Sequence, residues 1–408
     1  MKRRLLPILM TLVLVCALPI WAAFVTSGDV TNSLVCTAGA TSPPDNAATR
    51  LKSAISNGGT VQLTEDIEIS ETLVVTRDVT LDLNGHVLKM TGDVSVLKVS
   101  DRATLTITDS SAAKSGTITG GNAEYGGGVY VDDYAALKMT GGCITGCHAS
   151  RGGGGIYSSG NLYMGGTAKI EKCTGSDDAI WNRENSDIYA DGGTVDGTVN
   201  NQGTIKRSEG AAAVTVFNGT VYNRSAGTII AGIYNGTVEN NGTISGGTFC
   251  GGVTIRKGSW VWERTGSISG GTFYSSIVNE AGPERVTGVT FAVTFDRGDG
   301  TKTEPTPVKY NDLVPKPTAP TKSGYTFTGW EDANGAYDFN TPVTGPLTLT
   351  AKWEKVPSSG GNYYYHPTTD TKADDAKGSP KTADPGVALY AALSLLSLTG
   401  LTCTAKKR

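Results

Sequence analysis

The feature that most restricts how this chain can fold is a set of short repeats between residues 60 and 285. Within each repeat, apolar and polar residues alternate over a few positions, and glycine or asparagine lies nearby. Matching segments mostly recur about 22 to 26 residues apart, and this variable spacing argues against a rigid repeat of paired helices. The matching sets are 60–63, 80–83 and 104–107; 126–130 and 153–157; Val129, Ile156 and Ile180; Ile118, Ile144 and Ile170; 196–199, 218–221 and 235–238; and 244–249 and 268–273.

Alternation with a period of two predicts short β-strands whose alternate side chains point inward. A coil of that length cannot bury its inward Val, Ile and Leu side chains alone, so successive coils must stack into parallel sheets. Glycine and asparagine suit the corners, where the backbone needs a positive φ. The 54 glycines, against 8 phenylalanines and 5 methionines, fit a fold with many turns and small side chains.

This repeat pattern resembles the right-handed parallel β-helix of the pectate-lyase-like superfamily, although no motif of an enzyme family accompanies it. We therefore expect an all-β fold in which residues 24–287 form a β-solenoid. Some ten coils at about 4.8 Å each would give a rod on the order of 50 Å long.

A short capping helix is expected before the first coil, over residues 45–57. Asp45 can act as its N-cap, Leu51 and Ile55 lie one turn apart, and Gly58 with the next glycine ends it. Such a helix would cover the open end of the solenoid and shield its exposed sheet edge. At the far end, residues 274–287 and the following domain are both candidates for the cap.

Residues 288–355 differ in composition from the repeats before them. Their many prolines and short alternating segments predict a small β-rich module. Segments 324–330, 337–344 and 349–353 resemble the Listeria-Bacteroides repeat of the internalin B-repeat type. The resemblance implies a compact β-grasp-like unit of bacterial surface proteins, which serves as a spacer or contacts host or matrix ligands. Five aromatic side chains are expected to pack in its core rather than to stack on a ligand: Tyr325, Phe327, Trp330, Phe339 and Trp353.

The first 23 residues have the order of a secretory signal peptide. Basic residues at 2–4 precede an apolar run over 5–20, and Ala22 and Ala23 are small residues suited to cleavage. A run this short fits a signal peptide better than an uncleaved anchor, because a spanning helix needs about 20 apolar residues. The chain is therefore expected to be secreted.

Residues 379–408 have three parts in order: a pentapeptide, an apolar stretch over 387–404 and a basic end at 406–408. Basic residues there stop translocation, because charges are costly to bury in hydrocarbon. The order resembles a sortase cell-wall sorting signal, whose common form is Leu-Pro-x-Thr-Gly. The pentapeptide departs from that form at its first and last residues, which leaves the sortase class open; it reads Ser379, Pro380, Lys381, Thr382 and Ala383.

The resemblance implies that a sortase cysteine attacks the peptide bond after Thr382 and passes the acyl group to an amine of peptidoglycan. Sortase and peptidoglycan are thus the expected partners. The expected location is the cell wall of a Gram-positive-type bacterium, with the tail held in the membrane only before processing. A plain C-terminal membrane anchor is the alternative. Residues 356–378, rich in Gly, Ser, Thr, Lys and Asp, are expected to form a flexible wall-spanning linker.

The sequence gives little support for catalysis or for nucleic-acid binding. The 35 basic and 38 acidic residues give a net charge of -3, without the positive excess that phosphate binding needs. Acidic residues occur at 132–133, 177–178 and 184, but aligning Val129 with Ile156 stacks no two carboxylates in neighbouring coils. We therefore expect no catalytic residue, no metal and no cofactor.

Two cysteines are expected to meet inside the solenoid. Cys147 and Cys173 are 26 residues apart, and each lies three residues after a repeated isoleucine. They should stack in successive coils, either as a disulfide or as a pair of inward thiols. Cys143, Cys147 and His148 could suggest a metal site, but one spacing with one histidine favours a structural role.

Together these features predict a non-catalytic surface protein fixed to the cell wall, an adhesin or a ligand-presenting stalk. Its ligand would be a host or matrix glycan or protein. The alternative is a wall-displayed, carbohydrate-active β-helix enzyme, a polysaccharide lyase or hydrolase. A stack of acids with a basic residue in a surface groove would favour the enzyme, whereas a smooth face covered by Thr and Asn would favour binding or spacing.

Overall fold

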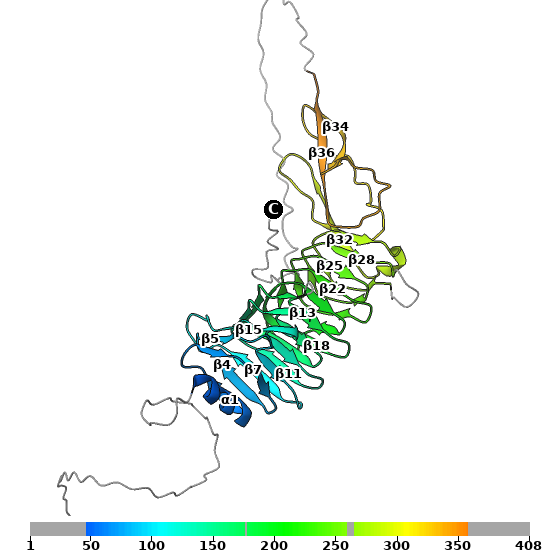
Figure 1. Cartoon of the computed structure of the whole chain (residues 1–408). Coiled ribbons are helices and arrows are strands. Elements are labelled where there is room, and N and C mark those ends of the chain that lie inside the picture. The colour runs from blue at the N-terminus through cyan, green and yellow to red at the C-terminus, as the bar shows by residue number, and fades with distance from the viewer. Residues whose placement is uncertain (1–45, 176–177, 259–264, 358–408) are drawn as a thin grey trace, which may run out of the picture.

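The computed structural model describes residues 46–175, 178–258 and 265–357 of the chain (Figure 1). It confirms the predicted all-β fold: one helix is followed by a parallel β-helix and then by a small separate sheet. Within these residues, no helix is long and apolar enough to cross a membrane. The following predicted parts lie outside the described residues: the signal peptide, the linker beyond residue 357, and Ser379, Pro380, Lys381, Thr382 and Ala383 with the tail.

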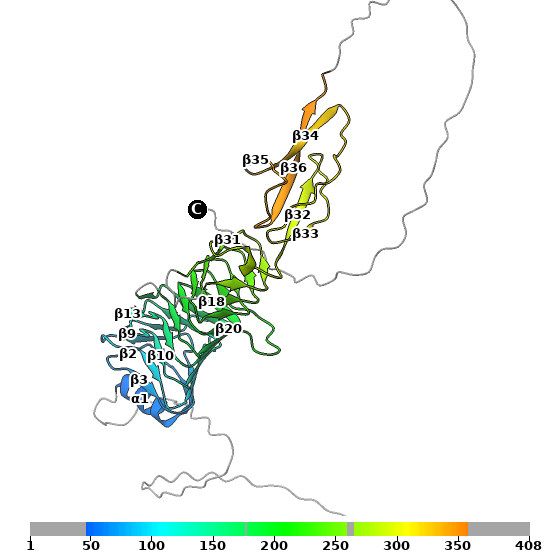
Figure 2. The same cartoon turned by 90° about the vertical axis from the view of Figure 1, so that its right-hand side faces the viewer.

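The β-helix has three long faces of parallel strands (Figures 1 and 2). An 18-stranded sheet contains two columns, joined by the long strands β15 (Asn161–Glu171) and β18 (Asp187–Asp196), which run through both. A ten-stranded sheet forms the third face. A three-stranded sheet lies between the second column and the ten-stranded sheet along the chain.

The strands of the first column, besides β15 and β18, are β1 (Gly59–Gln62), β4 (Val79–Asp82), β7 (Thr104–Thr108), β11 (Ala136–Met139), β20 (Thr204–Lys206), β23 (Thr228–Ile229), β26 (Thr243–Ile244) and β29 (Ser267–Ile268). Those of the second column are β2 (Ile67–Ile69), β5 (Val87–Met90), β8 (Thr117–Thr119), β12 (Cys143–Thr145), β21 (Val216–Phe217), β24 (Ile233–Tyr234), β27 (Thr248–Phe249) and β30 (Thr272–Phe273). The ten-stranded sheet contains β3 (Leu73–Val75), β6 (Leu97–Val99), β10 (Val129–Val131), β14 (Ile156–Ser158), β17 (Ile180–Asn182), β19 (Val199–Asn201), β22 (Val221–Asn223), β25 (Val238–Asn240), β28 (Val253–Ile255) and β31 (Ile277–Asn279). The three-stranded sheet contains β9 (Asn122–Tyr125), β13 (His148–Gly152) and β16 (Thr174–Gly175).

The helix α1 (Ala47–Asn57) begins one residue later than the sequence indicated. Its N-cap is Asn46 rather than Asp45, because the Asn46 side-chain oxygen accepts a hydrogen bond from the Ala48 amide at 3.1 Å. The backbone of Asn46 is extended, as an N-cap requires. Asp and Asn are equally good caps, so the sequence alone could not choose between two adjacent candidates.

One face of α1 packs on the first coil of the β-helix (Figure 1). Leu51 and Ile55 are both buried, and the helix contacts β1, β2 and β3. Gly58 ends the helix with a φ of +82°, a conformation that favours glycine. The helix therefore covers the end of the solenoid that the sequence predicted it would cover.

The strand register confirms most of the predicted repeat alignments. Val129 pairs with Ile156, which pairs in turn with Ile180. The isoleucine series with a period of 26 also pairs as expected, as do the Gly-Thr-Val repeats and the two Thr-Phe repeats. The repeats therefore identified both the stacking and, in these coils, the register.

One predicted alignment is wrong. Thr80 of β4 pairs with Thr106 of β7, not with Thr104. Threonine alternates with apolar residues along β7, so a shift of two residues leaves every side chain on its own face. The pattern alone cannot distinguish these two registers, and the path of the intervening turn decides between them.

Coil length varies more than the repeats suggested, and the core varies with it. The coil from Leu97 to Val129 takes 32 residues, whereas that from Val238 to Val253 takes 15. A short coil supplies fewer inward side chains, so larger ones fill the same interior. In the later coils the second column therefore has an inward ladder of rings, with centroids 4.7 to 5.0 Å apart: Phe217, Tyr234, Phe249 and Phe273.

A second inward ladder consists of buried amides. Asn182, Asn201, Asn223 and Asn240 end four successive strands of the ten-stranded sheet and are fully buried. Each Nδ2 donates to the Oδ1 of the next residue at 2.7 or 2.8 Å. A buried amide without such partners would cost about 1–3 kcal/mol. The sequence indicated asparagine only for corners, so this ladder was missed.

The C-terminal module is a five-stranded sheet in the order β33–β32–β36–β34–β35. Its central pair, β32 and β36, is parallel, and the other pairs are antiparallel. Its elements are η1 (Pro283–Arg285), which precedes the sheet, and β32 (Thr290–Asp296), β33 (Thr306–Lys309), β34 (Tyr325–Asp332), β35 (Gly335–Ala336) and β36 (Leu347–Lys355). This mixed sheet agrees with a β-grasp-like unit, but no helix packs on it within the described residues.

The aromatic residues of the module mostly pack as predicted. Trp330 is buried, and Phe327 lies edge-on to both Trp330 and Trp353 at 5.5 and 5.6 Å. Phe339 is half-buried. Tyr325 was wrongly assigned to the core: it is 40% exposed, because it lies at the outer end of β34.

The module covers the far end of the β-helix (Figure 2). The ring of Phe291 in β32 lies 6.4 Å from that of Phe273 and meets it edge-on, so the ladder of rings continues into the module. The Ile277 amide in β31 donates to the Thr344 carbonyl of the module at 2.8 Å. Both candidates for the second cap therefore contribute, because Val286 of the segment 274–287 also pairs with Ile268 in the last coil.

Candidate functional site

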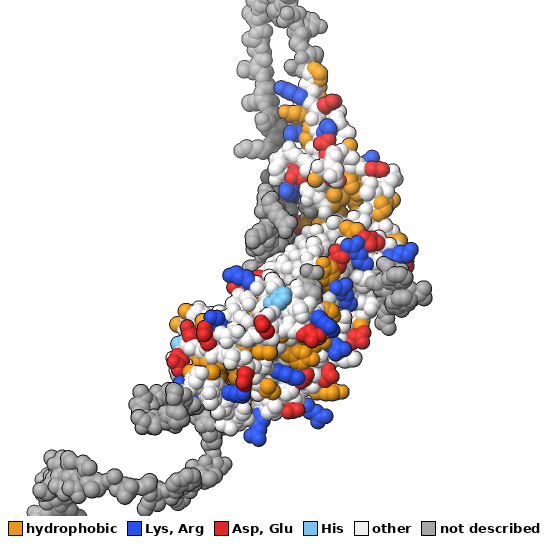
Figure 3. Space-filling model, viewed as in Figure 1, with side chains coloured by type: hydrophobic (Ala, Val, Ile, Leu, Met, Phe, Trp, Pro, Cys, Tyr) orange, Lys and Arg blue, Asp and Glu red, His pale blue; other side chains and the backbone are white. Residues whose placement is uncertain are grey.

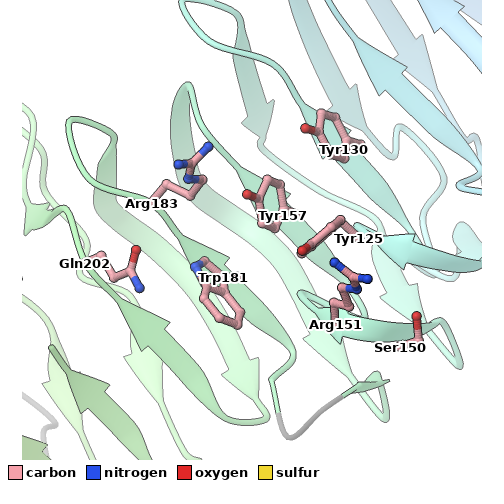
Figure 4. A pocket seen from close by; sticks show the side chains of 8 residues that line it. All are labelled: Tyr125, Tyr130, Ser150, Arg151, Tyr157, Trp181, Arg183 and Gln202. Atoms are coloured by element: carbon pink, nitrogen blue, oxygen red, sulfur yellow. The ribbon is translucent and has the colours of Figure 1, made fainter.

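A wide hollow lies between the ten-stranded sheet and the three-stranded sheet (Figure 4). Its volume is about 670 Å³, and we call it the aromatic groove. Eight residues line it: Tyr125, Tyr130, Ser150, Arg151, Tyr157, Trp181, Arg183 and Gln202.

The floor of the aromatic groove is a row of three outward rings. Tyr130, Tyr157 and Trp181 hold the same position in β10, β14 and β17, directly paired from strand to strand. The rings of Tyr130 and Tyr157 stack at 5.1 Å with an interplanar angle of 21°, and Trp181 lies 6.4 Å from Tyr157. Parallel, in-register strands therefore place three aromatic rings in a row along the axis of the β-helix, with Tyr157 buried between the other two.

Two walls rise beside this floor (Figure 4). One wall comes from the three-stranded sheet: Tyr125 of β9 approaches Tyr157 to 4.8 Å, and Ser150 and Arg151 extend from β13. The other wall consists of Arg183 and Gln202, which directly follow β17 and β19. The groove is therefore aromatic below and polar along both sides.

Glycine triplets make the sharp corner between the three-stranded and ten-stranded sheets. Gly126 and Gly153 have φ values of +60° and +65°, which favour glycine. A Cβ on Gly127 would lie 2.2 Å from the His148 carbonyl oxygen, and one on Gly154 would lie 2.0 Å from that of Thr174. The triplets, which the sequence showed as repeats, thus allow the extra strands to approach the floor.

A further glycine makes room for the indole of the floor. A Cβ on Gly152 would lie 2.1 Å from Cε3 of Trp181. The Trp181 ring therefore rests directly on the backbone of β13, and this contact fixes its position at the foot of the wall.

The charges on the groove lining are basic. Nε of Arg151 pairs with Glu124 at 2.9 Å, and its hydrogen bond with Tyr125 and the Glu124 charge raise the pKa of Arg151. Arg183, on the opposite wall, takes part in no ion pair with any other described residue. Neither wall nor floor contains a carboxylate.

Burial raises the pKa of Tyr130, and Tyr157 and Asp132 add to that effect, whereas the charge of Arg183 opposes it. The Lys98 ammonium lies 5.2 Å from the Tyr130 ring and pairs with Asp132 at 3.2 Å. The Tyr130 hydroxyl therefore stays protonated at neutral pH and can both donate and accept hydrogen bonds.

A second hollow of about 380 Å³ adjoins the groove and shares Arg183 with it. The two-residue turn at 159–160 is shorter than the turns of the coils on either side, and this difference leaves the hollow. Asp133 and Glu184 line it two coils apart, with the short turn between them. The coil between them contributes only Ser159, Gly160 and Asn161 to this hollow.

The other acidic candidates have structural contacts. Asp178 is buried, and its carboxylate accepts a hydrogen bond from Nδ2 of Asn200 at 3.3 Å. Asp177 lies outside the described residues. In the described part of the chain, no group of three or more His, Cys, Asp and Glu side chains is placed to hold a metal ion.

The two cysteines singled out in the sequence are buried and lie in neighbouring coils as free thiols. A hydrogen bond between them lowers the pKa of Cys147 and, with burial, raises that of Cys173. Burial also raises the pKa of Cys143 to about 11. Cys147 lies next to Gly128 and Cys173 next to Gly155, so both buried thiols sit behind the groove floor.

The groove residues Tyr125, Tyr130, Tyr157 and Trp181 were missed from the sequence. Two of the tyrosines lie in the repeated segments 126–130 and 153–157, but an outward position alone did not indicate a site. The available signal was the recurrence of outward aromatic residues in one register directly after glycine triplets.

Comparison with known proteins identifies one part of the chain. Residues 291–352 match the family model of the Listeria-Bacteroides repeat domain. The C-terminal module is a Listeria-Bacteroides repeat. The resemblance found in segments 324–353 is therefore confirmed, and the matched range nearly fills the predicted module.

Two curated relatives each match part of the chain. Internalin H of Listeria monocytogenes is 36% identical over 95 residues, which are 22% of this chain and 16% of that protein. A protein of Evansella cellulosilytica, named as a Gly-rich membrane protein, is 35% identical over 68 residues, 16% of this chain and 8% of that protein. The matches thus span less than a fifth of either relative. No solved structure matches the chain.

Proposed function

We propose that this chain is an exported surface protein, fixed covalently to the cell wall, whose β-helix binds a glycan in the aromatic groove. The observation that carries this proposal is the row of Tyr130, Tyr157 and Trp181 between two polar walls. We infer a binding protein, an adhesin, rather than an enzyme.

Sugar rings suit such a groove for a physical reason. A pyranose has a face of C–H groups that stacks on aromatic rings, and its edges carry hydroxyls that need hydrogen-bond partners. Tyr130 and Trp181, on either side of the buried Tyr157, offer partly exposed ring surface. Ser150, Arg151, Arg183 and Gln202 offer donors and acceptors along both edges. Concave sites with aromatic floors and a few polar groups are the usual form of a ligand site.

The repeat module and the ends of the chain support display outside the cell. The matched relatives are named as an internalin and a membrane protein. The N-terminal segment 1–23 has the order of a signal peptide, and residues 379–408 have that of a sorting signal. In this proposal, sortase cleaves after Thr382 and joins it to peptidoglycan, and the rod and linker hold the groove away from the wall.

The charge distribution also favours a glycan over nucleic acid. On the face shown in Figure 3, basic and acidic side chains are intermixed over the β-helix. The net charge of the chain is -3. Binding to a phosphate backbone requires a continuous basic surface, which such a mixture does not provide.

A second candidate function is glycan cleavage in the hollow beside the groove. Asp133 and Glu184 line this hollow and share it with Arg183, so two carboxylates and a guanidinium lie close to a bound chain. Pairs of carboxylates perform acid-base catalysis in many glycan-cleaving enzymes. Release of reducing ends or unsaturated products, lost in Asp133→Asn and in Glu184→Gln, would favour this second function.

The binding proposal is tested with the mature form, residues 24–382, on a glycan array followed by calorimetric titration of the bound glycans. Trp181→Ala should lower the affinity at least about tenfold, because it removes one stacking face from the floor. The matched control is Tyr222→Ala, an outward ring at the paired position two coils further along, outside the groove. Equal effects of both variants, or no binding to any glycan, would contradict the proposal.

Anchoring is tested separately on cell envelopes. Mass spectrometry of muramidase digests should find muropeptides linked to the carboxyl group of Thr382. Recovery of the intact tail beyond Thr382, with no linked muropeptide, would leave a membrane anchor instead.

A further inference from the structure

The charged side chains that line the aromatic groove are all basic. Its eight lining residues include two guanidinium groups and no carboxylate. Arg151 shares its charge with Glu124 outside the lining, at 2.9 Å, whereas Arg183 has no ion-pair partner among the described residues. The wall formed by Arg183 and Gln202 therefore presents a guanidinium group outside any ion pair, and the neighbouring carboxylates of Asp133 and Glu184 lie in the adjoining hollow rather than in the groove lining.

We propose that the groove selects a glycan whose sugar residues bear an anionic group, a carboxylate or a sulfate. This inference rests on the proposed function and names the class of ligand for the same site. A guanidinium presents parallel N–H donors that match two oxygens of such a group, which gives both strength and orientation.

The geometry assigns different tasks to the two walls. A glycan that lies along the rings of Tyr157 and Trp181 turns the substituents of its sugar rings toward the walls (Figure 4). The anionic substituent faces Arg183, while neutral hydroxyls face Ser150 and Tyr125 on the other side.

The adjoining hollow makes the groove more selective for the position of the anionic group. Beyond Arg183, Asp133 and Glu184 line the second hollow. Their negative charges repel an anionic substituent that would bind there instead. Arg183 therefore attracts the anionic group on its groove side only, and the carboxylates disfavour the alternative position.

The chain contains a matched control for Arg183. Arg224 follows β22 as Arg183 follows β17, each after an outward aromatic residue and a buried asparagine. Arg224 lies outside the groove lining and donates through Nε to Asn200 at 3.1 Å. Loss of charge at this position changes the net charge equally but leaves the groove unchanged.

The experiment titrates mature protein with three oligosaccharides of equal length: a hexuronate, a sulfated and a neutral one. At least one anionic oligosaccharide should bind about tenfold more tightly than the neutral one. Arg183→Gln should remove that preference, because it weakens anionic binding much more than neutral binding, whereas Arg224→Gln should change neither. Arg183→Lys should restore only part of the preference, because it keeps the charge without the planar pair of donors. Rising salt should weaken anionic binding more than neutral binding.

The outcomes separate this inference from the function on which it rests. Equal affinity for neutral and anionic oligosaccharides, with both lost in Trp181→Ala, would overturn the anionic selection and keep the glycan-binding proposal. Absence of binding to all three, and to every glycan on the array, would overturn both. Tighter binding of the hexuronate identifies the anionic group as a carboxylate, and tighter binding of the sulfated oligosaccharide identifies it as a sulfate. Because Arg183 is exposed, circular dichroism should show unchanged folding in its variants.

Discussion

Two coils of the β-helix carry the same local pattern and differ in what surrounds it. Trp181, Asn182 and Arg183 occupy an outward, an inward and a turn position after the first residue of β17. Tyr222, Asn223 and Arg224 occupy the same positions in β22. Of these six residues, only Trp181 and Arg183 line the aromatic groove.

The difference lies in one extra strand per coil. In the coils of β10, β14 and β17, the chain forms β9, β13 and β16 before it enters the ten-stranded sheet. Before β22, residues 218–220 make that connection without a strand. A face of parallel strands is flat by itself, so the additional sheet, not the outward residues, creates the concave site.

The largest expected effect comes from a substitution in the glycine corner between the three-stranded and ten-stranded sheets, where a side chain does not fit. Gly154→Ala would place a methyl group 2.0 Å from the Thr174 carbonyl oxygen, a backbone atom that cannot move alone. We expect a loss of about 3 kcal/mol in the free energy of unfolding, as for overpacked cores. Chemical denaturation measures it, and glycan binding should fall with it.

The control for this variant is Gly252→Ala in the corner before β28, where an added Cβ meets no atom within 4 Å. It should change stability by no more than about 0.5 kcal/mol. Similar losses in the two variants would show that the glycine corners of both regions are equally tight, which contradicts the comparison.

A smaller effect is expected when the wall is kept but the floor ring is displaced. Gly152→Ala would place its Cβ 2.1 Å from the Trp181 ring, which is a side chain and can rotate away. Glycan affinity should fall about tenfold, with near-native stability, because the ring leaves the row. Tryptophan fluorescence should report the new environment. Unchanged affinity would mean that the ring position is not part of the site.

The smallest expected effect is a dependence on pH that separates the first coils from the later ones. Burial alone would raise the pKa of Asp109, but hydrogen bonds from Ser111 and from the amides of Gly116 and Gly85 outweigh it and lower the pKa. The pKa of Asp82 is lowered in the same way. A lowered pKa in the folded state means stability that is present above the ordinary value of 3.8 and lost as pH falls through the folded value.

The later coils rely instead on Asn201 and Asn223, whose amides do not titrate. Acidification from pH 5 to below pH 3 should therefore reduce hydrogen-exchange protection in β4 and β7 before it does so in β22 and β25, after correction for intrinsic exchange rates. Earlier loss in the later strands would reverse this contrast between the two regions.

The sequence predicted the architecture well because coils that stack on one another have similar sequences at regular spacing. The pairing of Val129, Ile156 and Ile180 could be found from aligned glycine triplets and isoleucines. The predicted register failed at Thr104. There, alternation alone allows two registers, and the intervening turn decides between them. Periodicity thus predicts which residues point inward more securely than it predicts their partners.

The site could be predicted only in part. Tyr130 and Tyr157 were visible as repeated residues, but the wall that turns them into a groove depends on three short strands without a strong alternating pattern. The buried ladder through Asn201 was missed for a related reason: asparagine in an exposed corner and asparagine in a hydrogen-bonded stack look alike in one sequence.

The parallel pairing at the centre of the C-terminal module has a mechanical consequence. The chain enters the module at the start of β32 and leaves it at the end of β36, and four residue pairs join these neighbouring strands. A pull on the two ends of the module would load all four pairs together in shear. The strands could not separate one pair at a time, so the module would resist extension along the chain.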